Sequence, residues 1–81
     1  MGYRIKSRFI YKQVGQRLKQ LRNQKGVSQK VVADYLGVDR STYTNYEMGT
    51  TTMKYVTILM LARYFSVDFN TLLCYDLQTP N

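Results

Sequence analysis

The sequence contains no histidine and no tryptophan, and it has only one cysteine and one proline. The single Cys74 cannot form a disulfide within the chain, and without histidine a zinc site is effectively excluded, so we expect no metal and no other cofactor. The chain also lacks a glycine-rich phosphate loop, and its five carboxylates are scattered. Since Pro80 stands alone near the end, a turn-rich β architecture is disfavoured. These absences predict an all-α protein that is not an enzyme.

Long apolar runs are missing too. The longest, from Tyr55 to Ala62, is too short to span a bilayer. The start of the chain, residues 1–6, lacks the apolar region of a signal peptide. We therefore expect a cytoplasmic protein that makes no membrane contact. A chain of 81 residues allows one domain at most. It would bury only about 60–65% of its unfolded surface, so dimerisation would be a natural supplement to its stability.

Acidic residues are absent from the first thirty positions, although the net charge of the whole chain is +7. That segment holds nine of the twelve basic residues: Arg4, Lys6, Arg8, Lys12, Arg17, Lys19, Arg22, Lys25 and Lys30. A basic half on a small domain is typical of proteins that bind polyanions. An ordinary solvated basic helix would carry the same charge, so charge alone does not decide between the two.

The stretch from Ser28 to Gly49 has the pattern of two short helices joined by a sharp turn. Ser28 and Asp39 are good N-cap residues, because their side-chain oxygens can accept from free N–H groups of a first helical turn. Gly37 supplies the left-handed conformation that ends the first helix. A short turn containing glycine between two such helices indicates a helix-turn-helix.

The second helix of this pair has two unlike faces. Tyr43, Tyr46 and Glu47 recur at helical spacing on one side. The other side carries Arg40, Ser41, Thr44, Asn45 and Met48. Its short polar side chains suit a groove lined with base edges, because they can reach donors and acceptors there without clashing. A solvated face is the plainer alternative.

From about Val14 to Leu73 the chain resembles the Cro/repressor-type (XRE, lambda-repressor-like) helix-turn-helix proteins. The segments that carry the resemblance are residues 15–22 (GQRLKQLR), 26–29 (GVSQ), 36–43 (LGVDRSTY), 46–49 (YEMG) and 61–67 (LARYFSV). The resemblance implies an all-α, five-helix lambda-repressor-like domain that binds double-stranded DNA. We divide the chain into a basic N-terminal arm or helix extension (residues 1–10), the domain (residues 11–75) and a tail (residues 76–81).

Apolar spacing outlines the flanking helices. Tyr11, Val14, Leu18 and Leu21 form the buried stripe of a first helix that ends near Lys25, and an arm is favoured up to about Ser7. The fourth helix should bury Tyr55, Ile58, Leu59, Ala62 and Phe65. Family members often have proline near position 53 and a capping serine or threonine near position 54, but this chain has neither. Thr52 is the best remaining cap, Ser66 replaces the usual glycine stop, and Asp68 begins a short fifth helix.

The outer face of the third helix supplies the expected base contacts, Arg40, Ser41, Thr44 and Asn45. The expected phosphate contacts are Ser28, Gln29, Lys30, Tyr43 and Lys54. Gln29 follows the Ser28 cap, and a helix N-terminus readily binds an anion; the resemblance implies the same role. Tyr43 is equally well explained as a core residue.

Arg22 and Glu47 form an expected structural ion pair. A carboxylate near the C-terminal end of a helix is unfavourable against the helix dipole, and a planar arginine is a good compensating group. The resemblance implies that this pair holds the first helix to the third, serving the fold rather than base readout.

The sequence thus predicts a DNA-binding transcriptional regulator, specifically a homodimeric repressor that reads an inverted repeat with its third helix in the major groove. The alternative is an antitoxin-type or other protein-interaction module on the same scaffold, which would bind a protein partner. A third interpretation is non-specific binding to RNA or a membrane surface.

Overall fold

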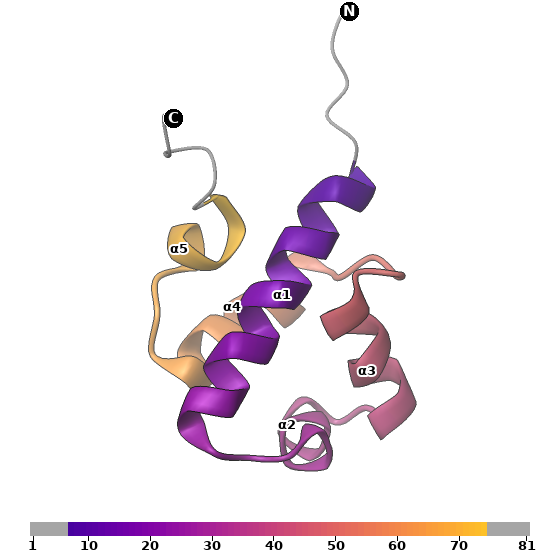
Figure 1. The fold of residues 1–81 in the computed structure, drawn as a ribbon, viewed down its shortest axis with the longest axis vertical. Coiled ribbons are helices and arrows are strands. Elements are labelled where there is room, and N and C mark those ends of the chain that lie inside the picture. Colours follow the sequence, from indigo (N-terminus) through magenta and orange to yellow (C-terminus); the bar gives the residue numbers. More distant parts are fainter. Residues whose placement is uncertain (1–6, 75–81) are drawn as a thin grey trace, which may run out of the picture.

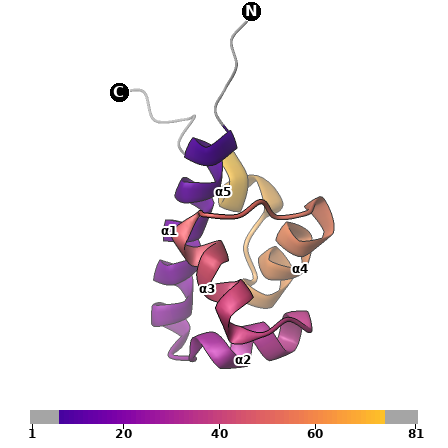
Figure 2. The same ribbon diagram turned by 90° about the vertical axis from the view of Figure 1, so that its right-hand side faces the viewer.

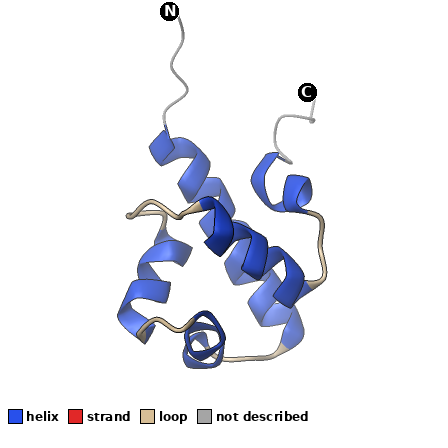
Figure 3. Ribbon diagram, turned by 180° about the vertical axis from the view of Figure 1, so that it is seen from behind, coloured by secondary structure: helices blue, strands red, loops and turns tan. Residues whose placement is uncertain are grey.

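The computed structural model describes residues 7–74, with side chains described from residue 9 to residue 73. Five α-helices make up this part of the chain: α1 (Ser7–Lys25), α2 (Gln29–Leu36), α3 (Arg40–Met48), α4 (Tyr55–Phe65) and α5 (Phe69–Cys74). Figure 1 shows α1 crossing the front, with α3 and α5 on either side of it and α4 behind. In the reverse view, every element of the described part is a helix or a loop (Figure 3). The predicted all-α, five-helix architecture is confirmed.

The first helix is the support against which α3 and α5 pack. Val14 and Leu18 are completely buried, and Tyr11 and Leu21 are partly buried against the same core, as the apolar spacing predicts. The helix ends at Lys25 as expected, but it already begins at Ser7. Residues 7–10 therefore extend the first helix toward the N-terminus. The basic residues Arg4 and Lys6 of the predicted arm lie outside the described residues, as does the predicted tail.

The turn between α2 and α3 has the local geometry that the sequence predicts. The Ser28 hydroxyl accepts from the backbone N–H of Val31 at 3.2 Å. At the other end of α2, Gly37 adopts φ +78°, the left-handed conformation that favours glycine. The Asp39 carboxylate then accepts from the backbone N–H of Thr42 at 3.3 Å and from its hydroxyl at 2.7 Å. Both α2 and α3 thus begin with an N-cap side chain whose oxygen accepts a hydrogen bond from a backbone N–H of the first turn.

The start of α4 differs from the prediction. Thr52 does not cap it, because the loop continues to Lys54 and the first helical residue is Tyr55. The lysine side chain has no hydrogen-bond acceptor, and no side-chain cap is formed. The predicted stop is correct, since Ser66 ends the helix in the left-handed region at φ 58°. The short α5 begins directly after Asp68, as expected.

The buried face of α4 is also slightly different from the expected one. Ile58, Leu61, Ala62 and Phe65 are its buried residues. Leu61 was not expected, whereas Tyr55 is 66% exposed because it lies at the open end of the helix. The Tyr55 ring packs against Phe69 of α5, with 5.0 Å between ring centroids. The core therefore lies between α1, α2, α3 and the C-terminal two turns of α4, with Leu72 of α5 completely buried against it.

Candidate nucleic-acid interface

Helix α3 presents its polar residues outward and its aromatic residues inward. Arg40, Ser41 and Asn45 are exposed and Thr44 is half-buried. The buried residues of this helix are Tyr43, Tyr46 and Glu47. Figure 2 shows α3 at the front, with α2 below it, α1 to its left and α4 to its right. The two faces that the sequence predicts are therefore present, and the outer face has no other described helix in front of it.

The inner face is held by the predicted ion pair. Arg22 Nε donates to Glu47 Oε2 at 2.6 Å, and Arg22 Nη2 donates to Glu47 Oε1 at 3.2 Å. The Arg22 side chain is 13% exposed and that of Glu47 is 3% exposed. The remaining Arg22 nitrogen, Nη1, donates to the carbonyl oxygen of Val27 at 3.1 Å. This pair joins α1 to α3 and also holds the start of the segment that leads into α2.

The electrostatics of the pair favour its charged form. Burial by itself would raise the pKa of Glu47, but hydrogen bonds from Arg22 and Gln29 outweigh it and lower that pKa. The hydrogen bond to Glu47 is the main cause that raises the pKa of Arg22. A buried carboxylate that stays ionised must have all its donors in place, so the residues around Glu47 are constrained in position.

Gln29 joins this ion pair to the outer face of α3. Its Nε2 donates to Glu47 Oε1 at 3.0 Å. Its Oε1 lies 2.8 Å from the hydroxyl of Thr44 and 3.2 Å from Nη1 of Arg40, and both are donors. The sequence predicts only a phosphate contact for Gln29. Its link to two expected base-contacting residues was missed, because hydrogen bonds between helices leave no periodic signal.

The other expected phosphate contacts divide into exposed and buried residues. Ser28, Lys30 and Lys54 are exposed. Lys30 also forms a solvent-exposed ion pair with Asp34 at 3.2 Å, a contact that contributes little to stability. Tyr43 is completely buried, and burial raises the pKa of its hydroxyl. Its hydroxyl does not reach the surface where a phosphate would lie, so the interpretation of Tyr43 as a core residue replaces the predicted phosphate contact.

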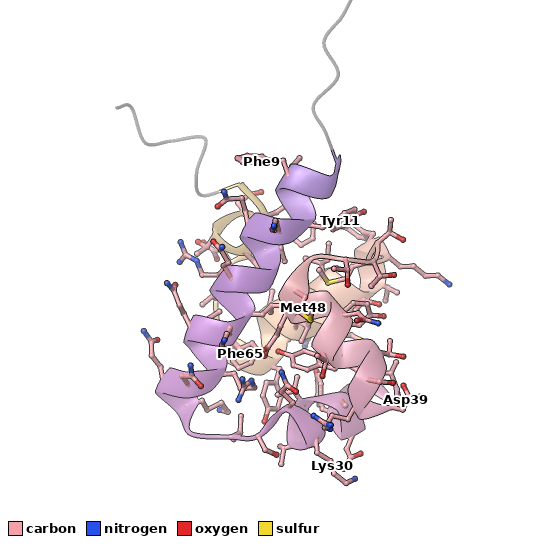
Figure 4. All side chains as sticks on the ribbon, turned by 45° about the vertical axis from the view of Figure 1, so that its right-hand side comes forward. Phe9, Tyr11, Lys30, Asp39, Met48 and Phe65 are labelled. Atoms are coloured by element: carbon pink, nitrogen blue, oxygen red, sulfur yellow. The ribbon has the colours of Figure 1, made fainter. Side chains whose placement is uncertain are left out.

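The basic residues of α1 do not form one uninterrupted patch. Arg22 is engaged with Glu47, and Lys25 Nζ lies 5.2 Å from the ring centroid of Tyr64. Lys12, in contrast, lines an open cleft of about 480 Å³ beside the C-terminal end of α3. The other lining residues are Tyr11, Met48, Gly49, Thr50, Thr51 and Thr52. Lys12 was not singled out from the sequence, yet it lies beside the outer face of α3; Figure 4 labels Met48 and Asp39 near the two ends of that helix.

Two other kinds of site are not found among the described residues. Among residues 7–74, no group of three potential metal-binding side chains comes together. No helix in this part of the chain has the length and hydropathy needed to cross a membrane. The outer face of α3, with its short polar side chains and its basic surroundings, is the surface best suited to a ligand that carries phosphates and base edges.

Comparison with known proteins identifies relatives. Residues 15–74 match a family model described as a helix-turn-helix domain. Over 59 residues the chain is 39% identical to the SPbeta prophage-derived uncharacterized HTH-type transcriptional regulator YonR of Bacillus subtilis. This match covers 73% of the chain and 55% of YonR. Over 56 residues it is 38% identical to the uncharacterized HTH-type transcriptional regulator YqaE of the same organism, covering 69% of the chain and 48% of YqaE. The chain thus spans about half the length of these two relatives.

Two solved structures have the same arrangement of helices. The restriction-modification controller protein C.AhdI from Aeromonas hydrophila superposes with a TM-score of 0.71 and 36% identity. That match covers 78% of this chain and 96% of C.AhdI. The DNA-binding domain of BldD superposes with a TM-score of 0.70 and 25% identity, covering 85% of this chain and 99% of that domain. Both superpositions cover most of the chain.

Proposed function

Because this chain belongs to the Cro/repressor-type helix-turn-helix family of DNA-binding transcriptional regulators, we propose that it is a sequence-specific repressor. It acts in the cytoplasm as a homodimer that binds an inverted-repeat operator and occludes a promoter. Its ligand is double-stranded DNA, which the outer surface of α3 recognises. Family membership also agrees with the prediction that the chain is not an enzyme.

The exposed polar face of α3 is the observation that carries this proposal. Arg40, Ser41, Thr44 and Asn45 project from a helix whose opposite face is fixed by buried rings and a buried ion pair. A helix of this kind in the major groove brings the side chains of its N-terminal turns to base edges. Arginine can donate to guanine O6 and N7 together, and asparagine can pair with adenine N6 and N7. Arg40 and Asn45 are therefore the main base-reading residues.

Backbone contacts come from residues around this helix. Ser28, Lys30 and Lys54 are exposed near the ends of α2 and α4, where they can reach phosphates on either side of the groove. The α2 N-terminus beside Gln29 adds backbone N–H groups that favour an anion. Gln29 itself combines a phosphate contact with its bonds to Arg40 and Thr44.

The homodimer forms through an apolar groove that leaves α2 and α3 free. This groove of about 360 Å³ is lined by Ile10, Tyr11, Met53, Tyr55, Ile58, Phe69 and Leu73. Phe9 at 56%, Tyr55 at 66% and Val56 at 56% are the exposed apolar side chains of the same segments. A second copy of the chain is the proposed occupant, because exposed apolar side chains border the groove and neither α2 nor α3 contributes to it.

Selection of bound sequences from a random pool of double-stranded DNA tests the function directly. We expect an inverted repeat whose half-site centres lie about 34 Å apart, one turn of DNA. Binding that depends steeply on salt but selects no sequence would contradict the proposal and would support the non-specific polyanion interpretation.

A further inference from the structure

The carboxylate of Glu47 has a second contact that the ion pair does not require. Its Oε2 accepts from Arg22 at 2.6 Å, while its Oε1 also accepts from Gln29 Nε2 at 3.0 Å. Gln29 belongs to α2, whereas Arg22 and Glu47 join α1 to α3. The buried charge is therefore in direct contact with a side chain at the edge of the proposed DNA surface.

This contact determines which way the Gln29 amide points. A carboxylate can only accept hydrogen bonds, so the Gln29 NH₂ group must face Glu47. The amide oxygen then faces the Arg40 guanidinium at 3.2 Å and the Thr44 hydroxyl at 2.8 Å. If the amide rotated by half a turn, its NH₂ group would face the Arg40 guanidinium. Both groups are hydrogen-bond donors, so no bond could form between them. Glu47 and Arg40 thus both favour one orientation of the amide, while the Thr44 hydroxyl can donate or accept.

The orientation of Gln29 in turn sets what α3 offers to DNA. Arg40 is held through Nη1, so its Nε and Nη2 hydrogens remain available for a base. The Thr44 hydroxyl has two acceptors within reach, Gln29 Oε1 at 2.8 Å and the Arg40 carbonyl oxygen at 2.9 Å. Because either of them can take its single proton, Thr44 presents lone pairs outward and favours the amino groups of adenine and cytosine. A rotated Gln29 amide would instead donate to Thr44 and occupy one of these lone pairs.

We infer that Glu47 is a positioning residue for base readout, acting through the Gln29 amide on Arg40 and Thr44. The sequence interpretation of Glu47 as a residue of the fold alone is therefore incomplete. This inference rests on the proposed function, since it concerns how the same surface selects bases.

The test compares Glu47→Gln with Arg22→Lys. Both variants weaken the ion pair, so both should lower the melting temperature. Arg22→Lys leaves the carboxylate that accepts from Gln29, so its base preference should match that of the wild type. Glu47→Gln introduces an amide whose NH₂ can donate to Gln29 and so favours the rotated orientation. It should lose most of the discrimination at the positions read by Arg40 and Thr44, which is roughly five- to a hundredfold for one good base contact.

The double variant Glu47→Gln with Gln29→Glu serves as a rescue. The carboxylate introduced at position 29 accepts from the introduced amide, from Arg40 and from Thr44, and so restores an acceptor where Gln29 Oε1 lies. We expect the wild-type base preference to return, although the affinity falls because a negative charge is added near DNA. Preference is measured as the ratio of affinities over a library of single-base changes in the selected operator, beside thermal unfolding of each variant.

The outcomes separate this inference from the proposed function. If Glu47→Gln lowers the melting temperature but keeps the preference at every position, Glu47 is a residue of the fold only. Equal changes in preference for Glu47→Gln and Arg22→Lys would overturn the inference too. If the wild type itself selects no sequence, the proposed function fails. The NMR signals of the Gln29 side-chain amide, assigned by their loss in Gln29→Met, then test its bond to Glu47 without DNA: they should shift in Glu47→Gln and stay in Arg22→Lys.

Discussion

Gly15 of α1 lies directly against the backbone of Glu47 at the end of α3. A Cβ atom at Gly15 would stand 2.3 Å from the Glu47 carbonyl oxygen and 2.5 Å from that of Tyr46. Both neighbours are backbone atoms, which cannot turn aside as a flexible side chain can. The two helices therefore approach as closely as they do because position 15 has no side chain, and the Arg22–Glu47 pair forms across the same contact.

The first prediction is that Gly15→Ala destabilises the protein. On helix propensity alone the change should gain about 1 kcal/mol. Overpacking costs about 1–3 kcal/mol, and here the clash is with backbone, so we expect a lower melting temperature. Gln16→Ala, at the adjacent exposed position of α1, is the matched control and should change stability by about 0.5 kcal/mol or less. An increase in melting temperature for Gly15→Ala would show that α1 and α3 can separate without cost.

The second prediction concerns acid. The pKa of Glu47 is below its ordinary value of 4.5 in the folded protein, so between the two values the unfolded chain binds more protons than the folded one. The contribution of this carboxylate to stability is therefore complete above 4.5 and is lost as the pH falls through the lowered value. The midpoint of urea unfolding, followed from pH 7 to pH 3, should fall less steeply in Glu47→Gln than in the wild type. Asp68→Asn, at an exposed carboxylate, is the control, and parallel curves for Glu47→Gln and the wild type would contradict the prediction.

The third prediction separates base contacts from phosphate contacts. Asn45→Ala or Arg40→Ala should cost about 1–3 kcal/mol on the selected operator and relax the preference at particular positions. Lys54→Ala is the control for a phosphate contact. It should weaken all sequences alike and reduce the slope of log K against log salt by about 0.9. Binding of the three variants to single-base operator changes is the measurement, and a uniform loss for all of them would mean that α3 does not read bases.

The fourth prediction concerns the dimer. Tyr55→Ser removes an aromatic side chain that is 66% exposed at the groove, so it should shift the protein from dimer to monomer in sedimentation equilibrium. Val31→Ser changes an apolar side chain of α2 that is 45% exposed but lies outside the groove, and it should leave the dimer intact. Dissociation by Val31→Ser instead of Tyr55→Ser would place the interface on α2.

The sequence predicted best those features that depend on neighbouring residues. The caps at Ser28 and Asp39, the left-handed Gly37 and the stop at Ser66 each involve groups within a few positions of one another. Their chemistry is local, so the residue type and its place in the pattern suffice. The Arg22–Glu47 pair joins residues that are far apart in the sequence. It was predicted because a glutamate near the C-terminal end of a helix needs a compensating partner. The family resemblance identified Arg22 as that partner.

The features that the sequence did not predict depend on three-dimensional packing. The close contact at Gly15 was not predicted, because its neighbour on α3 is remote in the chain. The bonds from Gln29 to Arg40, Thr44 and Glu47 come from the angle at which α2 meets α3. Tyr55 has an apolar spacing that fits the buried stripe of α4, but its position in the first turn places it beyond the edge of the core.

The uncapped start of α4 has a consequence for local motion. The first N–H groups of any helix have no partner within the helix, and at α4 the side chain of Lys54 does not supply one. The first turn, with the exposed Tyr55 and Val56, should therefore open more readily than the starts of α2 and α3, and its amide hydrogens should exchange with solvent faster. Because Tyr55 also lines the apolar groove, a second copy bound there would slow this exchange. Assembly of the dimer and ordering of this helical turn would then be one thermodynamically coupled event.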